Sequence, residues 1–218
     1  MAMHNAKPRG HFQRGASLVE LLIASALGLI AIMLVGSVFI RSQAVATERG
    51  KALLLAQNLS TAMAQMKEDM QRAGYDGLTD TYHQLSGASG VIHTQSSPEL
   101  VGYVYRVASS GASAFRNVVY KREPSSSATL GHSLKICEKH TPAPLSVSDA
   151  TDSGLHGNCY NVFDPKQISL TALTVNTETI RGGSTRSQQV NVILRAQLVG
   201  DTSVTFDTSS VTLQRNWQ

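Results

Sequence analysis

The longest pattern in the chain is an apolar run at residues 21–40, "LLIASALGLIAIMLVGSVFI", which contains no charged residue. About 20 apolar residues that rise ~1.5 Å each are long enough to cross the ~30 Å hydrocarbon core of a bilayer. The run therefore predicts one membrane-spanning helix.

Beyond this run, apolar residues recur at spacings of three and four, the pattern of a helix with one buried face. They are Ala52, Ala56, Leu59, Met63, Met66, Met70 and Ala73. A coiled-coil seam has a similar spacing, but Ala and Met are more typical of a helix packed on its own domain. Arg72 and Gly74 mark the end, because cations and a left-handed glycine favour a helix C-terminus. We expect one helix from Ala16 to Ala73.

After the helix, the pattern changes to short stretches rich in β-branched and aromatic residues and bounded by Gly, Ser and Pro. Strands are expected at 101–107, 115–122, 133–137, 159–163, 168–175, 189–199, 203–206 and 210–215. Apolar and polar residues alternate from Val190 to Leu198, as a sheet with one buried face requires. The predicted fold class is α+β: a long N-terminal helix, membrane-spanning in its first half, packed on an antiparallel β-rich head.

The charges around the apolar run predict its orientation. Lys7, Arg9 and Arg14 precede the run, and residues 1–15 contain no acid. Positive flanks stay on the cytoplasmic side of a membrane. Everything after Arg41 should therefore lie outside the cytoplasm.

The net charge of +4 comes mostly from this leader. Without its three basic residues, 16 of the 19 basic residues remain against 15 acidic ones. A nucleic-acid interface shows as clustered Lys and Arg on the domain itself. Arg181, Arg186 and Arg195 fit an ordinary solvated face, so nucleic-acid binding is not indicated.

The junction between leader and run differs from a secretory signal, which has a shorter apolar core followed by its cleavage site. Here the small residues at 15–17 precede the run, so cleavage after Gly15 would remove the charges and keep the helix. The sequence "GASLVELL" at 15–22 resembles the class III signal of type IV pilins and type II secretion pseudopilins. The resemblance implies that prepilin peptidase cleaves between Gly15 and Ala16 and N-methylates Ala16. Most family members begin with Phe or Met rather than Ala.

Glu20 would then be the fifth residue of the mature chain. An acid inside a bilayer costs a few kcal/mol and needs a partner. The amino terminus of Ala16 is the nearest available cation, and opposite charges attract strongly in a low-dielectric environment. We expect Glu20 to pair with this amine, in its own chain or a neighbour's, and the resemblance implies a role in subunit assembly. The alternative is an interfacial acid at headgroup depth.

The segment "RAGYDG" at 72–77 resembles the one that closes the long helix in PilW-type minor pilins. Its separation along the chain from the signal-like sequence at 15–22 is the one found in this family. A helix cap followed by a turn explains Gly74 and Gly77 equally well.

The chain has two cysteines, Cys137 and Cys159, and both fall outside the cytoplasm on the charge argument. Oxidation is normal there, so we expect a disulfide between them. Closing this loop stabilises the fold by roughly 3 kcal/mol on a chain-entropy estimate. No metal site is expected, because His140 and His156 lack a CxxC or HExxH arrangement.

These features divide the chain into four segments. They are a cytoplasmic leader at 1–15, a transmembrane or filament-core helix at 16–40, an amphipathic helix at 41–74, and a β-rich head at 75–218 with the disulfide-closed loop 137–159. The sequence has no phosphate-binding glycine loop, G-x-S-x-G or metalloprotease helix. We therefore expect no enzyme activity, no catalytic residue and no cofactor.

The resemblance implies a minor pilin that primes assembly of type IV pili or is incorporated near their tip. Its partners would be prepilin peptidase, other minor pilins, the major pilin and the inner-membrane assembly machinery. It would first lie in the bacterial inner membrane with a cytoplasmic N-terminus and a periplasmic head, then in the pilus at the cell surface. The alternatives are a J-type minor pseudopilin of a type II secretion system and a tip adhesin that binds through loop 137–159.

Overall fold

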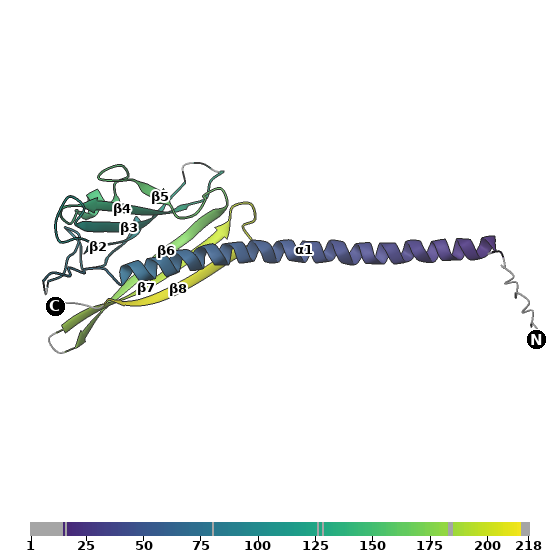
Figure 1. Cartoon of the computed structure of the whole chain (residues 1–218), viewed down its shortest axis with the longest axis horizontal. Coiled ribbons are helices and arrows are strands. Elements are labelled where there is room, and N and C mark those ends of the chain that lie inside the picture. The colour runs from purple at the N-terminus through teal and green to yellow at the C-terminus, as the bar shows by residue number, and fades with distance from the viewer. Residues whose placement is uncertain are drawn as a thin grey trace, which may run out of the picture. The chain divides into compact units, whose positions relative to one another are not determined.

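The computed structural model describes residues 15, 17–79, 81–125, 127, 129–182 and 185–214. In chain order (Figure 1), the elements are α1 (Leu18–Met70), β1 (His93–Ser96), β2 (Glu99–Arg106), β3 (Phe115–Glu123), β4 (Ser133–Thr141), α2 (Val147–Thr151), β5 (Cys159–Asn161), β6 (Ile168–Gly182), β7 (Thr185–Leu198) and β8 (Thr205–Gln214). The chain divides into two units, Met1–Glu48 and Arg49–Gln218. The α+β fold class predicted from the sequence is confirmed.

In the first unit, α1 is helical without interruption from Leu18 to Glu48. Its large apolar side chains are exposed; Leu18 is 74% exposed and Ile40 is 70% exposed. Gly28 and Gly36 do not break the helix, because a glycine inside a helix weakens it by only about 1 kcal/mol relative to Ala.

In the second unit, α1 buries one face. Its buried apolar residues are Leu55, Leu59, Ala62, Met63, Met66 and Met70. The expected stripe is confirmed from Leu59 onward, but it begins with Leu55, since Ala52 is exposed and Ala56 is half-buried. The helix ends at Met70, and a turn at 71–74 follows it.

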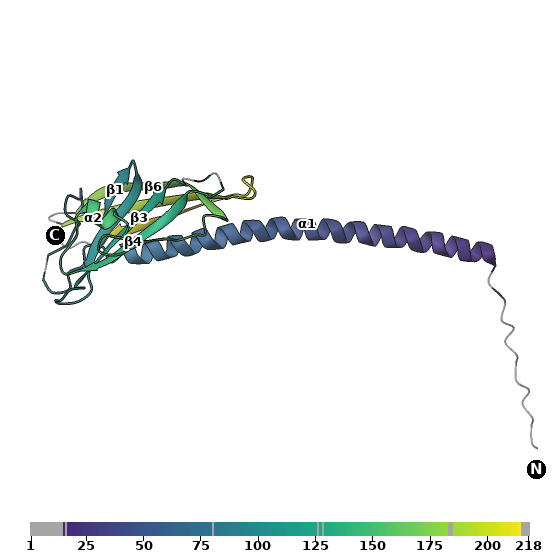
Figure 2. The ribbon, with the colours of Figure 1, turned by 90° about the horizontal axis from the view of Figure 1, so that it is seen from above.

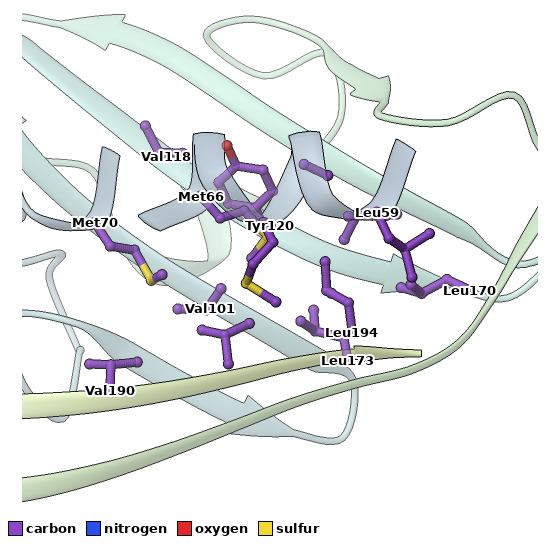
Figure 3. Close-up of a cluster of buried hydrophobic side chains, with 14 of the residues drawn as sticks. Leu59, Met66, Met70, Val101, Val118, Tyr120, Leu170, Leu173, Val190 and Leu194 are labelled. Atoms are coloured by element: carbon purple, nitrogen blue, oxygen red, sulfur yellow. The ribbon is translucent and has the colours of Figure 1, made fainter. Parts of the chain in front are cut away.

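The strands of the second unit form two antiparallel sheets. The five-stranded sheet has the order β1-β2-β3-β4-β5, and the three-stranded sheet has the order β6-β7-β8. Both sheets contribute to one hydrophobic core with the buried face of α1. Figure 3 shows Met66 and Met70 of α1 among side chains of both sheets, including Tyr120 and Leu194.

A second, smaller core covers the opposite face of the five-stranded sheet. It joins Leu100, Val104, Phe115 and Val119 to Ala150 of α2. Figure 2 shows α2 beside this sheet. Strand β2 is consequently buried on both faces from Leu100 to Tyr105.

Several elements differ from those expected. The strands expected at 203–206 and 210–215 form one strand, β8, because the polar residues between them pair with β7 without a break. Strand β6 continues to Gly182, where cross-strand pairing with β7 sustains a polar hairpin. Strand β1 and helix α2 were not expected, since both are short and lack a clear apolar period.

Candidate functional site

The first half of α1 is the segment with the composition of a membrane anchor. The helix contains an 18-residue window of mean hydropathy 2.6, and none of that window is buried. It is the one helix among the described residues that is long and apolar enough to cross a membrane. The apolar side chains that precede Arg41 therefore have no core of their own among the described residues of this unit.

The expected processing site lies at the start of this segment. Gly15 is exposed, and among the described residues no atom other than its own lies within 4 Å of the position that a Cβ would occupy there. Ala16, the expected site of N-methylation, lies outside the described residues. Glu20 is in the first turn of α1 and exposed. An acid at this end of a helix also faces the positive end of the helix dipole.

At the other end of α1, the segment at 72–77 makes a tight connection into the head. Gly74 has a φ of +81°, its N–H donates to the Val104 carbonyl at 2.8 Å, and a Cβ there would meet Val91 Cγ1 at 2.6 Å. Gly77 has a φ of +72°, which also favours glycine. The Arg106 N–H donates to the Tyr75 carbonyl at 2.8 Å. The two glycines of "RAGYDG" are therefore both required by the backbone.

Asp76, in the same segment, is the centre of a polar cluster. Its Oδ1 atom accepts from Arg106 Nε at 2.5 Å and contacts His83 Nε2 at 2.8 Å. Its Oδ2 atom accepts from the Thr79 N–H at 2.9 Å. Hydrogen bonds from Thr79, His83 and Arg106 hold the pKa of Asp76 well below its usual range. The cluster ties the end of α1 to strand β2.

Asp69, on the buried face of α1, makes a second polar connection to the five-stranded sheet. It accepts from the Tyr103 hydroxyl at 2.9 Å and from the Tyr105 hydroxyl at 2.6 Å. Arg116 Nη1 lies 3.2 Å from its Oδ1, and Arg116 Nε lies 2.8 Å from Glu138 Oε1. A buried charge of this kind is costly unless it is paired and hydrogen-bonded, and Asp69 is both.

The two tyrosines stay protonated donors in this network. Burial raises the pKa of Tyr105 to about 12, and its hydrogen bond to Asp69 adds to the effect. Burial also raises the pKa of Tyr103 well above its ordinary value, as does the charge of Asp69. Asp69 therefore keeps both hydroxyl donors at any physiological pH.

The two cysteines are brought together by strands β4 and β5. Cys137 and Cys159 are cross-strand partners with Cα atoms 4.0 Å apart, and the structure contains the expected disulfide. The enclosed loop is more ordered than its composition suggests, because it contains α2. Ser146 caps the N-terminus of α2 by accepting from the Asp149 N–H, and the buried Lys139 ammonium donates to the carbonyls of Asp149 and Asp152 at its C-terminus.

Among the described residues, no group of three or more His, Cys, Asp and Glu side chains could hold a metal ion. His140 Nε2 lies 3.4 Å from Glu138 Oε1, and the two residues form an exposed pair on strand β4. The polar clusters at Asp69 and Asp76 are filled by arginine, so they hold the fold together rather than bind a cation.

Comparison with protein families gives one match. The family model described as "Prepilin peptidase-dependent protein B" matches residues 48–214. The chain belongs to this family. No curated protein and no solved structure matches the chain.

Membership makes the chain a pilin-like structural subunit, of pilin or pseudopilin type, that is processed by prepilin peptidase. The match begins at residue 48, so it does not include residues 15–22, whose sequence resembles a prepilin signal. Two separate parts of the chain therefore indicate the same processing enzyme. The apolar first half of α1 fits membrane anchoring of a prepilin peptidase-dependent protein.

Three residues of structural importance were missed from the sequence: Asp69, Asp76 and Lys139. Asp69 interrupts an apolar stripe next to Met70, and this position could have marked it as a buried acid. No local signal identifies its tyrosine partners, which lie more than 30 residues away on β2. Lys139 has no sequence signal either, because its acceptors are backbone carbonyls.

Proposed function

We propose that this protein is a minor pilin of PilW type, which primes assembly of type IV pili or is incorporated near their tip. The observation that carries the proposal is the agreement between the signal-like sequence at 15–22, the helix-closing segment at 72–77, and the family match over 48–214. In this proposal, prepilin peptidase cleaves between Gly15 and Ala16 and methylates the amine of Ala16.

The first half of α1 is then buried first in the membrane and later in the filament. It holds the subunit in the bacterial inner membrane, with the leader cytoplasmic and the head periplasmic, and later packs with other helices in the filament. Glu20 pairs with an Ala16 amine when the subunit joins its neighbours. The exposed apolar surface from Leu18 to Ile40 supports this role, since it has no partner among the described residues of its own unit.

The head in this proposal is a rigid body joined firmly to the second half of α1. The clusters at Asp69 and Asp76 support this, because they tie the helix and its end to strand β2. The other minor pilins, the major pilin and the assembly machinery would be the partners of this body.

A J-type pseudopilin of a type II secretion system has the same plan of helix and head. Deleting the chromosomal copy separates the two functions: a minor pilin is expected to leave secretion intact and reduce surface filaments. Lost secretion with normal filaments would favour the pseudopilin instead. A tip adhesin is less well supported, because the second core and the buried Lys139 hold α2 of loop 137–159 against the head.

The proposed role of Glu20 is tested by Glu20→Gln, which keeps the shape of the side chain and removes its charge. We expect normal membrane insertion, while the amount of other pilin subunits that co-purifies falls at least ten-fold. Glu68→Gln is the matched control, since Glu68 is an exposed acid on the same helix and should assemble normally. If Glu20→Gln assembles like wild type at equal membrane levels, the charge pair is wrong and Glu20 is an interfacial acid.

A further inference from the structure

Strand β8 forms an open edge of the three-stranded sheet. The pairing of β8 with β7 determines which way each backbone N–H and C=O of β8 points. Just before β8, the Leu198 N–H donates to the Val204 carbonyl at 3.1 Å. The antiparallel register then continues without a shift to Gln214. Bonded and unbonded pairs alternate in such a ladder. Every second residue of β8 therefore directs its N–H and C=O away from β7. These residues are Thr205, Asp207, Ser209, Val211 and Leu213.

The other sheet edges are protected in ways that β8 is not. Strands β1 and β5 have four and three residues. The first part of β6 is covered, because the Leu170 N–H donates to the His132 carbonyl and Arg122 Nε donates to the Leu170 carbonyl. The far half of β6 carries Glu178 and Arg181.

Natural edge strands are usually protected by shortness, lysine, proline, bulges or a cover. Strand β8 has ten residues, with Asp207 as its one charged side chain and neither lysine nor proline. Among the described residues, no backbone hydrogen bond reaches its outer edge. A long edge with these properties is suited to pair with another strand.

A groove lies between this strand and α1. Its volume is about 520 Å³, and its lining residues are Lys67, Gln71, Val211, Thr212 and Leu213. Val211 and Leu213 are 54% and 51% exposed. Thr212 is 1% exposed, and its hydroxyl has no hydrogen-bond partner among the described residues. The groove thus offers two exposed aliphatic side chains, Val211 and Leu213, beside the open edge.

We propose that β8 accepts a β-strand from another pilin-like subunit, which extends the sheet to four strands. The proposal rests on the function proposed above, which supplies the class of partner. Donors and acceptors at every second residue, about 7 Å apart, match the repeat of an extended strand and not that of a helix. Main-chain bonds of this kind give affinity, and side-chain contacts give specificity.

The side chains along β8 define the chemistry of the incoming strand. The residue opposite Ser209 should be uncharged, because Ser209 is uncharged and so are its neighbours Thr208 and Ser210 on the strand. The incoming strand should place an aliphatic side chain beside Val211 and Leu213, at the groove. A basic residue should face Asp207 at the other end, since opposite charges across a strand pair are favourable.

Site-specific photo-crosslinking in the full chain tests the partner. A crosslinker at Val211 is compared with one at Asn176 on the opposite edge strand, β6. Asn191 of β7 is the cross-strand partner of both residues. We expect Val211 to crosslink to another pilin-like subunit in native membranes and Asn176 to give at least ten-fold less of that product. Crosslinking of Val211 to a second copy of this chain, to a protein of another class, or to nothing would overturn the proposal.

The variant Val211→Lys tests the edge itself, with Asn176→Lys as the matched control. Lysine on an edge opposes strand addition. We expect Val211→Lys to reduce co-purification of the partner at least ten-fold, with an unchanged unfolding midpoint, and Asn176→Lys to leave it unchanged. In the purified complex, hydrogen exchange at the amides of Ser209, Val211 and Leu213 should slow at least ten-fold relative to the free chain.

These results distinguish the two proposals. If wild type and Val211→Lys co-purify equally with pilin-like subunits, the docking edge is wrong and the minor-pilin function stands. If wild type co-purifies with no pilin-like subunit, both are wrong.

Discussion

The two parts of α1 have similar apolar side chains in opposite environments. Leu29, in the first unit, is 58% exposed, whereas Leu59, in the second, is fully buried. Burying a leucine side chain stabilises a protein by about 1.5–3 kcal/mol relative to leaving it exposed. The second part of α1 gains this free energy from its own head. In the proposed function, the first part gains it from lipid or from neighbouring subunits.

Two of the four acids of this helix, Asp69 and Glu20, show the same contrast. Asp69 finds Tyr103, Tyr105 and Arg116 within its own chain. Glu20 is exposed in a unit that consists of one helix among its described residues. A partner for Glu20 inside a membrane or filament would therefore come from an amino terminus or another subunit, as the proposed function requires.

The largest effect on the head is expected from Asp69→Ala. The substitution leaves the Tyr103 and Tyr105 hydroxyls without their acceptor and removes a charge that pairs with Arg116. We expect a loss of about 4 kcal/mol in the free energy of unfolding. Denaturant unfolding of the full chain in detergent, followed by near-ultraviolet circular dichroism, measures it. Glu68→Ala, the exposed neighbour, should change stability by less than about 0.5 kcal/mol. Equal effects of the two substitutions would show that the network contributes nothing.

A matched pair of methionines tests the contrast within α1 directly. Met66 is fully buried in the head core, and Met33 is 67% exposed in the first unit. Met66→Ala should cost about 3 kcal/mol of head stability, because it removes buried apolar area and leaves a cavity. Met33→Ala should leave the unfolding midpoint of the head unchanged in the same experiment. A comparable loss from Met33→Ala would mean that the first half of α1 contributes to the fold of the head.

A smaller effect is expected from the Asp76 cluster in acid. The pKa of Asp76 is lower in the folded protein than its ordinary value, so unfolding at low pH takes up a proton. Its contribution is complete above the ordinary value of about 3.9 and declines as the pH falls below it. Unfolding midpoints measured from pH 5 down to pH 2 should therefore fall less steeply for Asp76→Asn than for wild type. Parallel curves would exclude this linkage.

Local patterns were sufficient for much of the fold. The apolar run, the stripe from Leu59 to Ala73 and the alternation from Val190 to Leu198 each depend on residues close in sequence, and the structure agrees with all three. Strand β1 and helix α2 could not be predicted, because four or five residues carry too little periodicity.

The candidate site was predictable where its chemistry is local. The two glycines of 72–77, which have positive φ in the structure, could be predicted from adjacent residues, whereas the signal expected at 15–22 stays a prediction. The partners of Asp69 and Asp76 cannot, because β2 and β3 bring Tyr103, Arg106 and Arg116 to them only when the sheet forms. Contacts between residues so far apart in the sequence produce no periodic pattern from which they could be predicted.

Mass spectrometry of the mature amino terminus tests the central claim most directly, since both the membrane anchor and the role of Glu20 depend on where the chain begins. The protein is purified from native membranes, digested, and its first peptide identified. The account predicts a chain that begins with N-methylated Ala16 and retains the whole apolar segment. A membrane-associated chain that still begins at Met1, or one cut after the apolar run, would contradict it.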